Sequence, residues 1–182
     1  MKSLLDTHHQ TRRALLSRFW QAGCSLTAAS LLSACGFELR KAPELAFSTM
    51  YTNIAETSVF GQLLKRNLKT INNLEVITDT REIERAQVIL ELTQEAQEKV
   101  ILSKSSTGTV REYVLRYRVR FKLRTRDGFE LIPDTELVQE REISFNETAA
   151  LSKETEEQLL YRDMRSDLVQ QLMRRLAAVR QL

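Results

Sequence analysis

Five basic residues alternate along one segment of the chain and together could bind an anion. Between residues 111 and 126, the positions that separate these cations are apolar or aromatic. Side chains that alternate along a β-strand point to opposite faces, so the cations would share one face at a spacing of about 7 Å. Guanidinium and ammonium groups bind phosphate through charge-assisted hydrogen bonds. The row therefore predicts a phosphate-binding face, and it consists of Arg116, Arg118, Arg120, Lys122 and Arg124.

Acidic residues of the next strand could instead neutralise this row. An Asp-Gly pair at 127–128 predicts a two-residue hairpin turn, and Glu136, Glu140 and Glu142 follow it. Continuous pairing from that turn places Arg116 opposite Gln139. A one-residue shift at Pro133 places Arg116 opposite Glu140 and Arg120 opposite Glu136. Both interpretations remain open from the sequence.

Nucleic acid is a poor match for the basic face. The face that carries the cations has no aromatic side chain among them to stack on bases. Residues 1–34 hold four of the 27 basic and one of the 24 acidic residues, so 23 of each remain and the rest of the chain is formally neutral. We therefore expect no nucleic-acid partner.

The residues that most catalysts use are missing after position 34. Both histidines, the single tryptophan and one of two cysteines lie in the first 34 residues, as His8, His9, Trp20 and Cys24. A His/Cys metal site and a Ser-His or Cys-His nucleophile pair are thereby excluded from the remainder, and no cofactor is expected. A hydrolase could still use paired carboxylates such as Glu140 and Glu142. The composition favours a binding protein over an enzyme.

Cys35 is the only thiol after position 34, and its surroundings predict acylation. Three arginines precede an uncharged segment from Phe19 to Leu32, which is typical of a cleavable leader and too short to span a bilayer. The sequence Leu-Ser-Ala-Cys at 32–35 resembles the lipobox of bacterial lipoproteins. We expect a leader over 1–34, a lipidated tether over 35–44 and one domain over 45–182. Because Gly36 stands where an inner-membrane retention signal has Asp, the expected location is the periplasmic side of the outer membrane.

The elements that position these residues predict an α+β domain. Strands are expected over 45–52, 74–78, 87–102, 111–126 and 129–145. One helix follows a cap at Thr57 or Ser58, and the last helix is capped by Ser152. The order β-α-β-β-β-β-α predicts a mixed, mostly antiparallel sheet with both helices on one face. The last helix has an apolar stripe of Leu160, Met164, Leu168, Leu172 and Leu176, widened by Leu159 and Met173.

The chain resembles the LptE family of lipopolysaccharide-assembly lipoproteins. The similar features are Leu-Ser-Ala-Cys-Gly-Phe-Glu-Leu-Arg at 32–40, Gly108 before Glu112-Tyr113, Arg141 before Phe145-Asn146, and the final helix from Ala150 to Leu176. The chain departs from the family pattern at Glu38, where histidine is common, and in its short tail.

This resemblance implies a partner and a ligand. Members of the family plug the lumen of the outer-membrane β-barrel LptD as a heterodimer, help it assemble and take part in lipopolysaccharide transport to the outer leaflet. They bind lipopolysaccharide through basic residues at one edge of the sheet. Matching positions make Lys104, Arg111 and Arg141 the first candidates here, with Arg116, Arg118 and Arg120 second. Ser106 and Val138 stand where some members carry cations. The alternatives are the carboxylate-dependent hydrolase and a lipoprotein that only stiffens the envelope.

Overall fold

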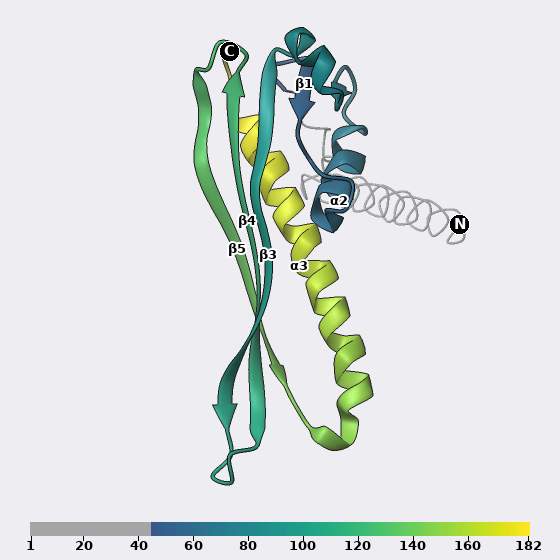
Figure 1. The fold of residues 1–182 in the computed structure, drawn as a ribbon, viewed down its shortest axis with the longest axis vertical. Helices are drawn as coiled ribbons and strands as arrows, with labels where there is room; N and C mark the ends of the chain where they lie inside the picture. The colour runs from purple at the N-terminus through teal and green to yellow at the C-terminus, as the bar shows by residue number, and fades with distance from the viewer. Residues whose placement is uncertain (1–44) are drawn as a thin grey trace, which may run out of the picture. The chain divides into compact units, whose positions relative to one another are not determined.

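The computed structural model describes residues 45–182 as a five-stranded sheet with two helices packed on one face (Figure 1). The elements follow the predicted order, and the α+β class is confirmed. They are β1 (Thr49–Thr52), α2 (Val59–Leu68), β2 (Glu75–Ile77), β3 (Val88–Lys104), β4 (Val110–Thr125), β5 (Glu130–Ser144) and α3 (Ala150–Ala178). Short 3-10 helices η2 (Thr80–Arg85) and η3 (Glu147–Ala149) were not predicted. The expected leader, Cys35 and the tether lie outside the described residues.

The sheet has the order β2-β1-β3-β4-β5. β1 runs parallel to both of its neighbours, β2 and β3, and the crossover through α2 accounts for the parallel β1–β2 pair. The other pairs are antiparallel. β1 pairs with β3 only over Val88–Leu90, so the greater part of β3, β4 and β5 forms a long three-stranded ribbon. In Figure 1 this ribbon runs down the molecule, with α3 crossing beside it.

Ser58 begins α2, in agreement with one of the two predicted caps. Its hydroxyl accepts a hydrogen bond from the Gly61 backbone N–H at 2.7 Å. Packing requires glycine at position 61, because a Cβ on Gly61 would overlap the side chains of Ile54 and Ser58. The helix buries Phe60, Leu64 and Leu68 toward the sheet.

The start of α3 corrects a prediction. The helix begins at Ala150, and no side chain caps it. Ser152 lies inside the helix, where its hydroxyl donates to the carbonyl of Ala149 at 2.8 Å. The cap is displaced because η3, whose N-cap Asn146 accepts from the Thr148 N–H, continues directly into α3.

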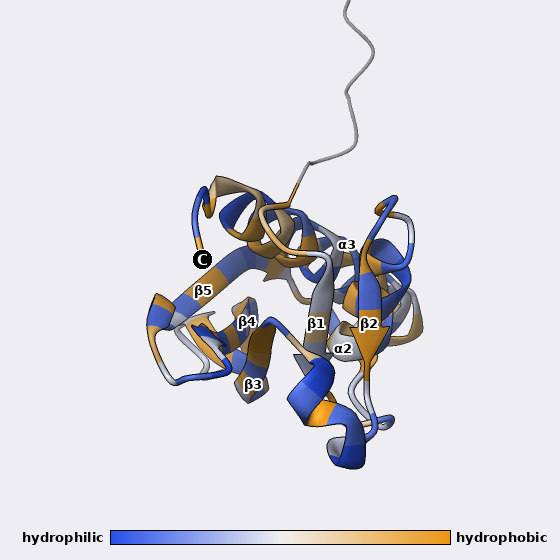
Figure 2. Ribbon diagram, turned by 90° about the horizontal axis from the view of Figure 1, so that it is seen from above, coloured by the Kyte–Doolittle hydropathy of each residue, from blue (hydrophilic) through white to orange (hydrophobic). Residues whose placement is uncertain are grey.

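The apolar stripe of α3 is confirmed except at one edge. Met164, Leu168, Leu172, Met173 and Leu176 are buried, and Leu160 is partly buried against the core. Leu159 was expected to widen the stripe but is exposed, and the neighbouring Tyr161 is buried instead. Figure 2, looking along the molecule, shows both helices on the same side of the sheet. The core therefore lies between these helices and the inner face of the sheet.

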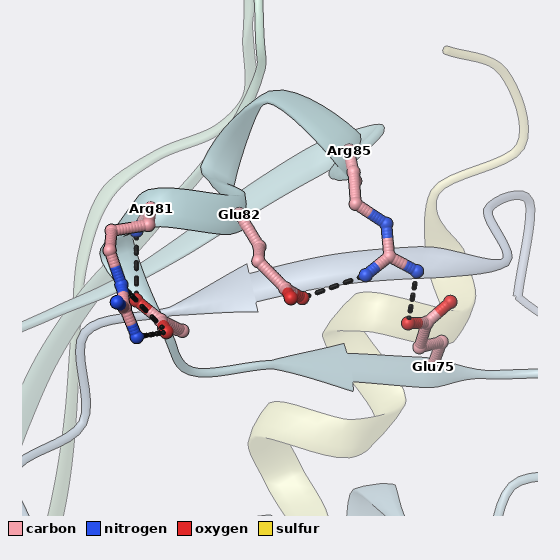
Figure 3. Close-up of polar contacts among 5 residues, drawn as sticks. Glu75, Arg81, Glu82 and Arg85 are labelled. Carbon is pink, nitrogen blue, oxygen red and sulfur yellow. Dashed lines mark hydrogen bonds and ion pairs between the residues drawn. The ribbon is translucent and has the colours of Figure 1, made fainter.

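A smaller apolar cluster covers the opposite face of the sheet near β1 and β2. Tyr51, Ile77 and Ile89 are buried there, with Ile83 of η2 packed over them. Arg85 holds η2 against the sheet, because it pairs with Glu82 of η2 at 2.7 Å and with Glu75 of β2 at 2.8 Å (Figure 3). On this face η2 therefore covers β1 and β2, whereas no described helix covers the long ribbon of β3, β4 and β5.

The turn between β4 and β5 is one residue longer than predicted. The Thr125 N–H donates to the carbonyl of Phe129 at 2.8 Å, and the Gly128 N–H donates to the carbonyl of Thr125 at 3.1 Å. Gly128 has φ +94°, a conformation that L side chains rarely adopt. Asp127-Gly128 is thus part of a three-residue turn, in which a type I turn is followed by a glycine with positive φ.

Candidate functional site

The five-cation row lies on the open face of the ribbon, which we call the outer face because α2 and α3 pack on the other side. Arg116 is paired with Glu140, and Arg120 with Glu136, in the strand register. Register shifts on both sides of Leu123 produce this alignment, and Pro133 lies within the shifted stretch of β5. The pairing that neutralisation requires is therefore the one that the fold adopts.

Acids from both neighbouring strands contact the row. Arg116 pairs with Glu140 at 2.5 Å and with Glu98 at 3.3 Å. Arg118 also pairs with Glu98, and Arg120 pairs with Asp134 at 2.9 Å. Lys122 and Arg124 both contact Glu91, at 3.0 and 2.8 Å. Partly exposed ion pairs of this kind contribute about 0–1 kcal/mol each. Their main effect is to remove the repulsion that five neighbouring cations would otherwise produce.

Glu91 is the most enclosed acid of this arrangement. Burial raises the pKa of its carboxyl, but hydrogen bonds from Arg124 and Lys122 together with their positive charge outweigh burial, so the pKa is lowered. Glu91 is therefore an anion at neutral pH, held between two cations.

Lys104 and Arg111 lie apart from this row, at the end of the ribbon that we call the tip. They flank the turn from Ser105 to Thr109, and Lys104 is the register partner of Val110, the residue before Arg111. Both side chains are exposed. Unlike the cations of the row, they form no ion pair with any residue of 45–182. Two of the three first candidates thus lie at either end of one turn, both exposed and without an ion pair inside residues 45–182.

Arg141, the last of the three residues that were first candidates, lies on β5 and away from the tip. It follows Glu140 on β5, with the core residue Leu115 of β4 as its register partner. It pairs with Asp167 of α3 at 3.2 Å and donates to the side chain of Gln139 at 3.1 Å. Arg141 thus links the edge strand to the last helix, and an anion would have to displace Asp167 to engage it fully.

Three consecutive apolar residues lie beside the tip cations, and the sequence analysis did not single them out. Val100, Ile101 and Leu102 of β3 are 48%, 46% and 47% exposed. Strand alternation normally exposes every second residue, but the pairing of β3 with β4 is irregular between Ile101 and Ser103. The tip therefore combines an apolar edge with free cations. The only signal in the sequence was the uninterrupted run of three aliphatic residues.

Glu95 forms a polar cluster on the inner face, and its role there is structural. It accepts hydrogen bonds from the Ser58 hydroxyl at 2.5 Å, the Phe60 N–H at 3.3 Å and the Tyr117 hydroxyl. It also lines a hollow of about 550 Å³ beside the start of α2. Because both carboxylate oxygens already accept hydrogen bonds, this acid holds α2 on the sheet.

Glu140, a member of the predicted carboxylate pair, is paired with Arg116 on the open outer face. Across residues 45–182, no group of three or more His, Cys, Asp or Glu side chains is placed to hold a metal ion. No helix in that part of the chain is both long and apolar enough to cross a bilayer.

Comparison with known proteins identifies the family. The lipopolysaccharide-assembly model of the LptE family matches residues 47–176. Lipoprotein B of Nitrosomonas europaea, solved by NMR, is 34% identical, with a TM-score of 0.67 over 79% of this chain and 91% of that one. No curated protein sequence is significantly similar.

Two crystal structures share the fold at lower identity. Rare lipoprotein B of Shewanella oneidensis is 22% identical, with a TM-score of 0.59 over 71% of this chain and 94% of that one. A minor lipoprotein of Acinetobacter baumannii is 18% identical, with a TM-score of 0.57 over 74% and 94% of the two chains. The family model and the Nitrosomonas relative confirm the resemblance seen in the sequence: the chain belongs to the LptE family of lipopolysaccharide-assembly proteins.

Proposed function

We propose that this protein is an outer-membrane lipoprotein, acylated on Cys35, that plugs and helps to assemble the β-barrel LptD and binds lipopolysaccharide during its transport. The observation that carries the proposal is the family match over residues 47–176. Three relatives of the same fold are themselves described as lipoproteins. The protein acts by surface contact and has no enzymatic step.

The outer face suits a position inside a barrel. The lumen of a large outer-membrane barrel is polar, so a domain inside it needs a polar, mixed-charge surface. Acids on β3 and β5 alternate with the cations of β4, and the resulting surface has both signs at close spacing. Such a surface can exchange its internal ion pairs for pairs with polar groups of the lumen.

The tip is the proposed contact for lipopolysaccharide. The lipid part of this molecule carries phosphate groups beside acyl chains, and the tip offers Lys104 and Arg111 beside Val100, Ile101 and Leu102. Free cations bind phosphate without first breaking an ion pair. Arg116, Arg118, Arg120 and Arg141 are secondary contacts, because each would have to release an acid.

Co-purification tests the partnership. The acylated protein, tagged at its carboxyl end, is recovered from gently solubilised outer membranes, and the bound proteins are identified by mass spectrometry. The proposal expects a large β-barrel in about one-to-one amount. Recovery of the protein as a free monomer from those membranes contradicts it. An alternative hydrolase would instead lose its envelope function in the variants Glu140→Gln and Glu142→Gln.

A further inference from the structure

The end of the molecule opposite the tip, which we call the base, has its own surface chemistry. The described chain enters there: the Ser48 N–H donates to the side chain of Gln87 at 2.7 Å. Gln87 also lines a hollow of about 600 Å³ with Arg126, Phe129 and Leu182. In Figures 1 and 2 the carboxyl terminus and the first residues of β5 lie together at this end. The start of the described chain, the turn between β4 and β5 and the terminus thus share one end.

Phe129 is the prominent feature of the base. Its side chain is 68% exposed, the largest exposed fraction of any aromatic residue among 45–182. The three-residue turn places it just before β5, and besides the hollow beside Gln87 it lines a second one of about 530 Å³ with Arg175 and Arg180. An exposed aromatic ring with arginines around it is typical of side chains that lie at the boundary between lipid and water.

The length of the chain before Leu45 decides which end of the molecule can reach a membrane. Leu45 lies ten positions after Cys35 in the sequence, and a fully extended chain of that length reaches about 35 Å. β3 has 17 residues and so carries the tip roughly 55 Å from the base. With acyl groups on Cys35, the base therefore lies near the bilayer, and a bilayer surface at the tip would be out of reach of the anchor.

We infer that the base is a membrane-contact surface, on which Phe129 enters the lipid headgroup region beside the acyl anchor. The inference rests on the proposed acylation of Cys35 and adds a second, non-covalent contact. The occupant is a lipid surface rather than a protein, because the anchor itself brings lipid to this end.

The charges around Phe129 define the kind of contact. Arg126, Arg175 and Arg180 contribute positive charge, but Asp127 and Glu130 lie among them. The base is therefore not a polybasic patch that depends on anionic lipid. Insertion of the ring supplies the contact, so it should persist at 1 M salt, where charges are screened within about 3 Å.

A single tryptophan can report this contact. The chain after position 34 has no tryptophan, so Phe129→Trp introduces one fluorophore at the base. Leu151→Trp is the matched control, because Leu151 is 80% exposed at the start of α3, beside the tip end of the molecule. Both acylated variants are reconstituted into vesicles of phosphatidylethanolamine and phosphatidylglycerol, with and without dibrominated acyl chains, and isolated by flotation.

The expected result is a blue-shifted emission of Phe129→Trp that brominated lipid quenches, at low and at high salt, while Leu151→Trp keeps the emission of a solvated ring. Equal, unquenched emission from both variants in the floated fraction would overturn the membrane contact and leave the anchor intact. A shift of Phe129→Trp without quenching by brominated lipid would assign the surface to a second protein molecule and overturn it as well. Failure of either variant to float would contradict the acyl anchor, and this inference would fall with it.

Discussion

The hydroxyl of Tyr117, in the middle of β4, donates a hydrogen bond to the carboxylate of Glu95 on β3. The same carboxylate accepts from Ser58 and from the Phe60 N–H at the start of α2. One buried hydroxyl and one acid therefore join two strands of the ribbon to the first helix.

Tyr117→Phe should destabilise the protein by about 1–2 kcal/mol, because Glu95 loses a donor in a partly buried position. Burial, followed by the hydrogen bond to Glu95 and its negative charge, raises the pKa of Tyr117 above its usual 10.0. The stability that this hydroxyl contributes is thus fully present below about pH 10 and is lost as the pH rises beyond it. Urea denaturation should show the difference from wild type shrinking above pH 10, and a constant difference contradicts the assignment.

Glu91→Gln should lower the free energy of unfolding at pH 7 by about 1 kcal/mol, because Lys122 and Arg124 lose their shared anion. The lowered pKa of Glu91 means that its contribution is present above the usual 4.5 and is lost as the pH falls through the folded value. The two proteins should therefore converge in strongly acidic buffer. An unchanged gap at low pH would show that the loss comes from packing.

Gly61→Ala should lower the free energy of unfolding by more than Gly108→Ala does. At Gly61 a methyl group overlaps Ile54 and the capping Ser58, and overpacking of this kind costs about 1–3 kcal/mol despite the better helix propensity of alanine. At Gly108 the space is open, and only the φ of +87° opposes a side chain, at about 1 kcal/mol. Urea denaturation of both variants measures the difference, and the reverse ranking would contradict the close approach of Ile54.

Leu168→Ala should cost about 2–5 kcal/mol, since Leu168 is fully buried in the stripe of α3 against the sheet. Leu159→Ala is the control, because Leu159 was expected in the same stripe but is exposed. A change below about 0.5 kcal/mol is expected for the control. Similar losses of stability in both variants would mean that α3 is rotated about its own axis, with Leu159 also facing the sheet.

Periodic patterns in the sequence predicted most of the fold. The stripe of α3 and the alternation along β4 identify the core faces, because both depend on one residue type repeated at a fixed spacing. Turn length was harder to predict. Asp127-Gly128 suits a two-residue turn, but the Thr125 hydroxyl accepts the Phe129 N–H at 3.1 Å and favours a longer one. Ser105 does the same for the Thr109 N–H at the tip.

The candidate site was only partly visible in the sequence. Lys104 and Arg111 were candidates by resemblance, but whether an acid of residues 45–182 pairs with them depends on which acids the strand register brings near. The fold also decides the partner of Arg141, because Asp167 is 26 residues away in the chain. Val100, Ile101 and Leu102 are exposed because their pairing with β4 is locally irregular and because, among the described strands, only β4 lies beside this part of β3. The run of three aliphatic residues is the one local signal of the apolar edge, and no local pattern encodes its exposure or the choice of ion-pair partners.

Binding to immobilised lipopolysaccharide tests the central claim most directly. The acylated wild-type protein is compared with the double variant Lys104→Glu/Arg111→Glu and with the control Arg66→Glu, which reverses an exposed cation on α2. The account predicts that the double variant loses at least tenfold in affinity while the control binds like wild type. Wild-type affinity in the double variant, with its circular dichroism spectrum unchanged, would contradict the tip as the lipopolysaccharide contact.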